Sequence, residues 1–173
     1  SNGILFNHES PRRGENFITR KVIIGIIKIL KGHQKCLYLG NLKSKRDWGH
    51  AKEFVDAQWK ILQYKTPDDF VIATGKNYSV KDLVNLVLKK LKIKYLWKKD
   101  KKGYEYAIAQ NDIGQIKKSQ IIIKQEKIYF RPNEVHNLVG DYRKATKLLK
   151  WKPKIKFDRL ISEMIDSDLK NII

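Results

Sequence analysis

The fold prediction for this chain depends on residues 3–14, Gly3-Ile-Leu-Phe-Asn-His-Glu-Ser-Pro-Arg-Arg-Gly14. The segment begins with a short apolar run, which is typical of a buried strand, and continues as a polar loop. In open α/β sheets, ligands bind in the crevice beyond the carboxyl ends of the strands. Asn7 and His8 directly follow the apolar run, so this loop is the first candidate for a ligand site.

The strand expected at 3–6 lies almost at the start of the chain. A buried parallel strand needs neighbouring strands on both sides, and only two residues precede this one. We therefore expect that further sequence belongs upstream. Without it, the sheet edge beside Ile4 and Leu5 would lie open.

Strands and helices alternate along the first half of the chain, and this alternation predicts an α/β fold. Gly32 marks the end of the first helix, and Ser79 with Asp82 forms a capping-box pattern at the start of the third. Residues 92–127 are the least patterned part, where we expect two strands separated by a lysine-rich loop. The expected helices are 16–30, 51–63, 79–91, 143–149 and 157–169, and the expected strands are 3–6, 36–39, 70–73, 94–97 and 120–124.

The composition is that of one folded domain. The chain has 173 residues, of which 42% are hydrophobic, and this is enough to bury a core. No apolar run approaches the roughly 20 residues of a membrane span, and no secretory signal is visible. The single cysteine, Cys36, cannot form an internal disulfide. These features predict a cytoplasmic protein without a membrane segment.

The formal net charge of +19 raises the question of a nucleic-acid partner. Most of the basic residues are lysines spread along the whole chain, whereas arginine, the better base reader, is scarce. This distribution favours a lysine-rich solvated surface over a nucleic-acid-binding site. An anionic small ligand would also suit part of this charge.

Arginines in three loops are the candidate ligand groups. In the first loop, Asn7 offers an amide and His8 a ring nitrogen. Arg12 and Arg13 add planar guanidinium groups that match phosphate oxygens. The alternative is a solvated basic turn in which His8 only caps a backbone group.

The second loop is Arg46-Asp-Trp-Gly49. Arg46 could hold a phosphate while Asp47 fixes the guanidinium in place. The alternative is a structural salt bridge packed on a partly buried Trp48.

The third loop is Arg131-Pro-Asn-Glu134, which Pro132 stiffens. Arg131 and Glu134 could face one ligand, one at a phosphate and one at a hydroxyl, or they could form a surface ion pair. A sugar nucleotide carries a pyrophosphate, several hydroxyls and a flat base, and the three loops together fit those groups. Spacing alone does not bring the loops together.

Signatures of other enzyme classes are missing. The sequence has no Gly-x-Gly-x-x-Gly turn, no P-loop, no zinc-type cysteine pattern and no Gly-x-Ser-x-Gly elbow, and we expect no metal site. Tyr95 and Lys99 match Tyr-x-x-x-Lys, in which helical spacing sets a lysine beside a tyrosine and lowers its pKa. This match lies where a strand runs into a lysine-dense loop, so we interpret it as a coincidence.

Several long stretches resemble the GDP-mannose 4,6-dehydratase family. The resemblance runs from about Asn2 to Leu169, with residues 92–127 as its weak part. The stretches, in the family's order, are Asn2–Lys21, Leu39–Lys52, Pro67–Gly75, Tyr129–Val135, Leu148–Pro153 and Ser162–Met164.

The resemblance implies an extended short-chain dehydrogenase/reductase, with an amino-terminal Rossmann domain for NADP and a smaller carboxy-terminal domain for the sugar nucleotide. Residues 1–30 and 48–75 would add elements to the Rossmann layer, and residues 31–47 and 76–173 would form mainly the substrate domain. The family converts GDP-mannose to GDP-4-dehydro-6-deoxy-mannose, on the route to GDP-fucose. NADP takes the hydride from C4 and returns it to C6 after water is eliminated across C5 and C6.

Carried over by position, the resemblance implies two groups of binding residues and no catalytic residue. His8 and Arg13 would contact NADP. Arg46 and Arg131 would neutralise the pyrophosphate, and Glu134 would accept a hydrogen bond from a hydroxyl. The implied substrate-binding residues are Asn7, Lys21, Arg46, Arg131 and Glu134.

The family's glycine-rich turn and its catalytic Thr, Glu and Tyr-x-x-x-Lys lie upstream of the first residue of this chain. The resemblance therefore implies a partial Rossmann-like fold that lacks the amino-terminal dinucleotide-binding half and is inactive alone. Its expected partners are GDP-mannose and the missing half or a full-length subunit, in an intact enzyme that is a homo-oligomer. The alternative function is a non-catalytic module that binds nucleotide sugars or polyanions such as nucleic acid.

Overall fold

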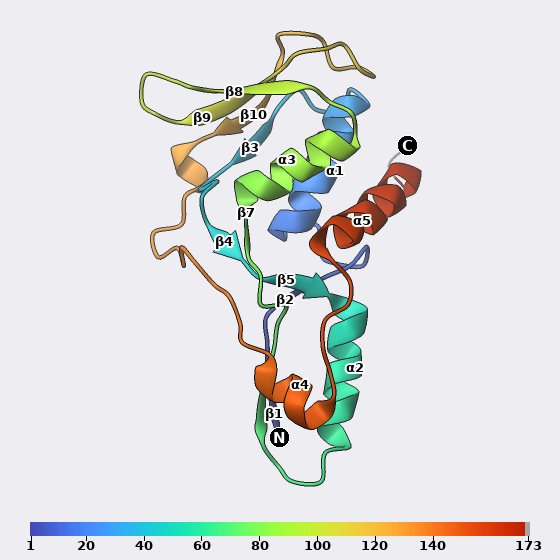
Figure 1. Ribbon diagram of the computed structural model, residues 1–173. Helices are drawn as coiled ribbons and strands as arrows, with labels where there is room; N and C mark the ends of the chain where they lie inside the picture. Colours follow the sequence, from blue (N-terminus) through green and yellow to red (C-terminus); the bar gives the residue numbers. More distant parts are fainter. Residues whose placement is uncertain (172–173) are drawn as a thin grey trace.

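The computed structural model describes residues 1–171 and has the α/β fold expected from the alternation of strands and helices. The elements gather into two bodies, one toward each end of an elongated molecule (Figure 1). Each body has an apolar core of its own, and the two cores differ in size.

The large body is a four-stranded sheet packed against helices. Its elements are β3 (Leu37–Leu39), β8 (Tyr95–Lys99), β9 (Glu105–Ala109), β10 (Ile121–Gln125), α1 (Ile18–Leu30), α3 (Val80–Lys90) and α5 (Phe157–Asn171). The strand order is β3-β10-β9-β8, in which β10 runs parallel to β3 and antiparallel to β9. Helices α1 and α3 lie side by side on one face of the sheet, and α5 packs on both (Figure 1).

Helix α1 is central to the large core because nearly all of its residues from Val22 to Ile29 are buried. A helix that is apolar on most sides is stable only when other elements surround it. The helix ends as predicted at Gly32, whose φ of +85° is the left-handed conformation that glycine adopts without strain.

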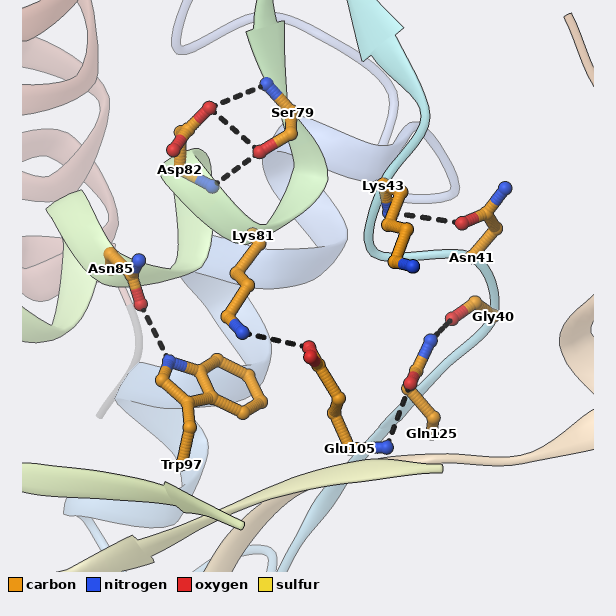
Figure 2. Close-up of polar contacts among 10 residues, drawn as sticks. All are labelled: Gly40, Asn41, Lys43, Ser79, Lys81, Asp82, Asn85, Trp97, Glu105 and Gln125. Carbon is orange, nitrogen blue, oxygen red and sulfur yellow. Dashed lines mark hydrogen bonds and ion pairs between the residues drawn. The ribbon is translucent and has the colours of Figure 1, made fainter. Parts of the chain in front are cut away.

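Helix α3 begins with the predicted capping box, drawn in Figure 2. The Ser79 hydroxyl accepts from the Asp82 amide at 3.0 Å, and the Asp82 carboxylate accepts from the Ser79 amide at 2.9 Å. These two hydrogen bonds satisfy amides that the first helical turn leaves unpaired. Together they set the start of the helix at the residue that the sequence indicates.

Polar side chains tie α3 to the sheet beneath it (Figure 2). The Lys81 ammonium lies 2.8 Å from the Glu105 carboxylate on β9. The Trp97 indole on β8 donates to the Asn85 side chain at 2.9 Å. Both contacts are partly shielded from water, so they fix the register of helix against sheet more firmly than exposed pairs would.

The small body is built on two parallel strands. It contains β1 (Asn2–Leu5), β6 (Asp69–Ile72), α2 (Ala51–Leu62) and α4 (Arg143–Leu149). Its core consists of Phe54, Ala57, Ile61, Phe70, Ile72, Ala145, Leu149 and Trp151.

The prediction of a buried strand at 3–6 was wrong in one respect. The strand forms as β1, but among residues 1–171 it pairs only with β6, and Ile4 is 53% exposed. On the outer side of α2, Val55, Trp59 and Leu62 are also exposed, and their spacing places them in one apolar stripe.

Short strand pairs connect the two bodies. Strand β2 (Asn7–Glu9) runs parallel to β5 (Trp48–His50), and β4 (Lys45–Arg46) runs antiparallel to β7 (Tyr78–Ser79). A single 3₁₀ turn, Lys127–Tyr129, follows β10. These pairs bring the three predicted arginine loops to the same side of the large body.

The structure differs from the prediction between the last two expected strands. Strand β9 lies within the segment expected to be a lysine-rich loop, and it is the central antiparallel partner of β8 and β10. The interpretation of Tyr95 and Lys99 as a coincidence is confirmed, because both lie on the extended strand β8 and not on a helix. Partial burial raises the pKa of Tyr95, the opposite of activation.

The predicted division into residues 1–30 and 48–75 and residues 31–47 and 76–173 stays a prediction. The packing of single helices cuts across it at two places. Helix α1 contributes to the core of the large body, and α4 packs against β6 and α2 in the small body.

Candidate functional site

A cavity of about 600 Å³ lies on the large body, where β2, the start of α1, the turn after β3 and the segment after β10 meet. It gathers most of the residues that the sequence singled out, although they are up to 127 positions apart. The predicted site residues that line it are Asn7, Arg13, Lys21, Arg46, Arg131 and Glu134.

Of the binding residues that the resemblance implies, His8 is the one that does not line the cavity, and Arg12, the other arginine of the first loop, does not line it either. Its Nδ1 lies 2.9 Å from the Phe6 carbonyl oxygen, and its ring stacks on Phe54 at 5.0 Å. A carbonyl oxygen only accepts, so Nδ1 carries the proton, and Nε2 of the neutral ring is an acceptor. The sequence alternative, in which His8 caps a backbone group, describes this contact.

Arg13 is held at the cavity wall by its neighbours. Its guanidinium carbon lies 3.5 Å from the centre of the Phe17 ring, and its Nε lies 3.4 Å from the Glu9 carboxylate. Glu9 is almost fully buried, accepts a 2.5 Å hydrogen bond from the Thr19 hydroxyl and also lines the cavity. Burial raises the pKa of Glu9, against the opposing effects of Thr19 and Arg13.

Arg46 is paired with Glu134, a contact between residues far apart in the sequence. One Nη of Arg46 bonds to the Glu134 carboxylate, and the other donates to the carbonyl of Lys45 at 2.8 Å and to that of Val135 at 2.5 Å. The ion pair considered for the third loop was between Arg131 and Glu134, and the structure pairs Glu134 with Arg46 instead. The second and third loops are thus joined, and a phosphate contact of Arg46 stays a prediction.

The expectation that Asp47 fixes the Arg46 guanidinium is wrong. Asp47 is fully buried and turns its carboxylate toward backbone amides of Thr74, Gly75 and Gly140, at 2.9, 2.9 and 3.2 Å. Adjacent residues of an extended strand point to opposite faces, which is why Asp47 cannot reach its neighbour's guanidinium. Its role is to hold three segments of the chain together.

Lys21 and Arg131 are the two cations of the cavity that no carboxylate within residues 1–171 neutralises. The Lys21 ammonium lies 4.7 Å from the centre of the Tyr129 ring, and partial burial lowers its pKa. Arg131 makes no hydrogen bond or ion pair with any residue from 1 to 171. Both groups are therefore available to an anionic ligand without first breaking a salt bridge.

The charge of the lining favours an anion. Its cations are Arg13, Lys21, Arg46 and Arg131, and its carboxylates are Glu9 and Glu134, which leaves an excess of two positive charges. A diphosphate diester carries two negative charges, so the two match. Charges partly enclosed by protein interact more strongly than charges on an open surface.

The back wall of the cavity requires a glycine. A Cβ at Gly40 would overlap with the Tyr129 carbonyl oxygen, so no larger residue lets the turn after β3 meet the 3₁₀ turn. The Gln125 side chain fixes this wall, because it donates to the Gly40 carbonyl at 2.9 Å and accepts from the Glu105 amide at 2.8 Å (Figure 2).

Sequence reasoning missed Glu9, Phe17, Gly40 and Tyr129 as parts of the site. The available signals were the four-residue spacing of Glu9 and Arg13 and the position of Tyr129 two residues before Arg131. Within residues 1–171, no group of three or more His, Cys, Asp or Glu side chains is placed to hold a metal ion. No helix in that range is long and apolar enough to cross a membrane.

Comparison with known proteins identifies the family. A family model described as GDP-mannose 4,6 dehydratase matches residues 1–164. The chain belongs to the GDP-mannose 4,6-dehydratase family. The resemblance drawn from the sequence motifs is therefore confirmed.

Relatives in the GDP-mannose 4,6-dehydratase family match along nearly the whole chain. The GDP-mannose 4,6-dehydratase of Vibrio cholerae is 45% identical over 172 residues, which are 98% of this chain and 46% of that protein. The GDP-mannose 4,6 dehydratase of Homo sapiens is 44% identical over 170 residues, 98% of this chain and 44% of that protein. The chain thus spans about half the length of the curated relatives it matches.

Solved structures share the fold of this family member at much lower sequence identity. RMD from Pseudomonas aeruginosa, in complex with NADPH, matches with a TM-score of 0.74 and 16% identity, over 98% of this chain and 48% of RMD. The dTDP-glucose 4,6-dehydratase of Bacillus anthracis, in complex with NAD, has a TM-score of 0.70 and 16% identity, over 98% and 44% of the two chains. The partial extended short-chain dehydrogenase/reductase fold is thereby confirmed.

Proposed function

We propose that this chain is the sugar-nucleotide-binding part of a GDP-mannose 4,6-dehydratase and that the cavity binds GDP-mannose. The observation that carries the proposal is the convergence of four cations and two carboxylates, from three separate stretches of the chain, on one cavity. Family membership supplies the identity of the sugar nucleotide, and the excess of positive charge explains how the diphosphate would be neutralised.

The cavity residues can be grouped by whether each charged side chain already has an ionic partner. Arg131 and Lys21, which have no carboxylate partner among the described residues, bind the diphosphate. The Arg46–Glu134 pair borders the same space, and Glu134 keeps a second oxygen for a hydroxyl of the sugar or ribose. Asn7 offers an amide that both donates and accepts.

His8 and Arg13 would contribute one edge of an NADP site. The donor set fits, because Arg13 presents a guanidinium for a phosphate and the free Nε2 of His8 can accept from a hydroxyl or amide. NADP supplies the hydride chemistry when bound. In residues 1–171, Tyr95 and Lys99 are the one Tyr-x-x-x-Lys match and lie on a strand, so we assign no catalytic residue.

Activity would further require the dinucleotide-binding half of the family's enzymes, because this chain spans only about half of their length. The cytosol is the compartment proposed for this assembly. In the complete enzyme, the large body would hold the sugar nucleotide, and the dinucleotide-binding half would add the acid and base.

Calorimetric titration of the 173-residue chain with GDP-mannose tests the binding proposal. The expected result is saturable binding at one site, weakened about tenfold by Arg131→Ala, the size of one charge-assisted hydrogen bond. Lys101→Ala, on the exposed β8–β9 turn outside the cavity, is the control and leaves binding unchanged. Binding to single-stranded DNA with a steep salt dependence, and no heat with GDP-mannose, would instead favour the polyanion-binding alternative.

Co-expression with a matching dinucleotide-binding half tests the activity proposal. The complex should convert GDP-mannose to a 4-dehydro sugar, and Arg131→Ala should raise KM more than it lowers kcat, because diphosphate binding does not change during the reaction. A complex that forms but makes no 4-dehydro sugar would contradict the dehydratase assignment.

A further inference from the structure

Arg20 lies in the first turn of α1 and does not line the cavity, yet it contacts the loop that carries Arg13. One Nη of Arg20 donates to the Arg13 carbonyl at 2.9 Å and also to the Pro11 carbonyl. Among residues 1–171, Arg20 is the only side chain that donates to a carbonyl of the 10–14 loop. These hydrogen bonds attach the loop to α1.

The other end of the Arg20 guanidinium is fixed by α5. Its second Nη lies 2.8 Å from the Asp168 carboxylate, which is 2% exposed although it lies 148 positions further along the chain. One guanidinium therefore links the loop, α1 and the last helix of the large body.

This buried pair is not arranged for stability alone. Arg20 Nε and one oxygen of Asp168 are buried without a hydrogen-bond partner among the described residues. A buried ion pair with unpaired atoms stabilises a fold weakly, because the cost of removing the charges from water is not fully offset. Such pairs are better suited to selecting one conformation of a segment.

The conformation that Arg20 selects is the one that presents Arg13 to the cavity. The loop closes on itself through the Arg13 amide and the Ser10 carbonyl, at 2.9 Å. Arg13 then leaves the loop toward Phe17 and Glu9, the groups that hold its guanidinium at the cavity wall. Releasing the two carbonyls from Arg20 would let the loop turn, and the guanidinium would lose its fixed direction.

We propose that Arg20, anchored by Asp168, is a positioning residue that fixes the 10–14 loop so that Arg13 faces the ligand. This inference rests on the proposed function for its ligand and on the structure for its geometry. Arg20 acts through Arg13 and does not touch the ligand.

The test uses Arg20→Gln and Asp168→Asn, with Asp158→Asn as the matched control. Asp158 also lies on α5 and forms an exposed ion pair with Lys90, so it reports what loss of a carboxylate on that helix does by itself. Hydrogen–deuterium exchange of a peptide covering residues 9–17 should be about tenfold faster in both test variants and unchanged in the control. Unchanged exchange in Asp168→Asn and Arg20→Gln would overturn the proposal.

Titration of the same variants with GDP-mannose and with NADPH distinguishes positioning from general damage. Arg13→Ala should weaken binding of NADPH, the ligand proposed for Arg13, and Arg20→Gln and Asp168→Asn should weaken NADPH binding about tenfold and spare GDP-mannose. In the Arg13→Ala background, Arg20→Gln should add nothing. The positioning role would be overturned if the losses of affinity from Arg13→Ala and Arg20→Gln were additive, or if both ligands were affected equally.

A failure of the proposed function would give a different result from a failure of the positioning role. In that case the unmodified chain would bind neither ligand, and the exchange experiment alone would decide whether Arg20 fixes the loop.

Discussion

The large and small bodies of this protein bury their apolar residues to very different degrees. In the large body, α1, α3 and α5 enclose a continuous core on one face of a four-stranded sheet. In the small body, two parallel strands and two short helices share a much smaller core, and Ile4, Trp59 and Leu62 face outward. Parallel pairs are normally covered on both faces, so the small body is the less self-sufficient of the two.

The candidate site follows this division. Every residue that lines the cavity belongs to the large body, to the strand pairs beside it or to the loops between them, and none lies on β1, β6, α2 or α4. The proposed sugar-nucleotide site therefore lies in the large body and its connecting strand pairs, apart from the small core. The large body should retain its site even when the small body is loosened.

Trp151→Ala should produce the largest effect and divide the two bodies most clearly. The indole is buried in the small core, donates to the Glu53 carbonyl at 2.9 Å and meets the edge of Phe54. Its removal should destabilise the small body by about 3–5 kcal/mol. Hydrogen exchange should then rise in β1 and β6 and stay slow in α1 and β10. Equal loss of protection in both bodies would show that they unfold as one unit.

Gly40→Ala is the corresponding change in the large body. The added Cβ would push the Tyr129 carbonyl away, at a cost of about 1–3 kcal/mol, and would open the wall that Tyr129 and Arg131 share. Affinity for GDP-mannose should fall with stability, as calorimetry and thermal melting would show. Gly3→Ala in the small body serves as the control, because its Cβ would meet a Leu5 methyl at 3.3 Å and should leave binding intact.

Acidification should change the stability of the two bodies differently, by less than the substitutions above. Burial raises the pKa of Glu9 and Asp168 in the large body, so their folded forms hold protons more tightly than the unfolded chain does. Their burial penalty is present above the folded pKa and is relieved as pH falls through that value toward the unfolded one. Arg143 lowers the pKa of Asp141, beside the small body, from 3.8 to about 2, so the contribution of this exposed carboxylate changes only below pH 3.8 and does not alter the comparison between pH 7 and pH 5.

The measurement is hydrogen exchange of both bodies at pH 7 and pH 5, compared after correction for the intrinsic exchange rate. Between pH 7 and pH 5, the stability of the large body should rise relative to that of the small body. This rise should be smaller than the loss of stability caused by Gly40→Ala. Glu9→Gln should remove part of that gain. A parallel decline of both bodies, unaltered in Glu9→Gln, would contradict the assignment.

Trp59→Ser should have the smallest effect on folding. Its side chain is 60% exposed on the outer stripe of α2, so stability should change by no more than about 0.5 kcal/mol. Because the stripe is apolar, the substitution should reduce concentration-dependent association in sedimentation experiments. Stability loss comparable to that of Trp151→Ala would mean that the stripe already packs against something in solution.

The sequence predicted features that depend on local signals. The capping box at Ser79 and the glycine stop at Gly32 gave the ends of their helices closely, because both are set by neighbouring residues. Strand β9 was missed because its short alternation lies beside a lysine-rich turn that resembles a solvated loop. Its place in the sheet depends on pairing with β8 and β10, which no local pattern records.

The sequence predicted which residues belong to the candidate site but not which of them contact one another. The family resemblance supplied six residues that share the cavity, and the three arginine-bearing loops could be recognised from their residue types alone. The Arg46–Glu134 pair was beyond prediction because it joins residues whose approach is decided by packing of the large body. Asp47 was misassigned for the same reason, since its partners are backbone amides from two distant turns.

The central claim is that loops from three parts of the chain close on the diphosphate of one GDP-sugar. The most direct test is the ratio of the GMP and GDP dissociation constants, because these two ligands differ by one phosphate. The account predicts that GDP binds at least about tenfold more tightly than GMP and that Arg131→Ala brings the ratio close to one. Equal affinities in the unmodified chain, or a ratio that Arg131→Ala does not change, would contradict it.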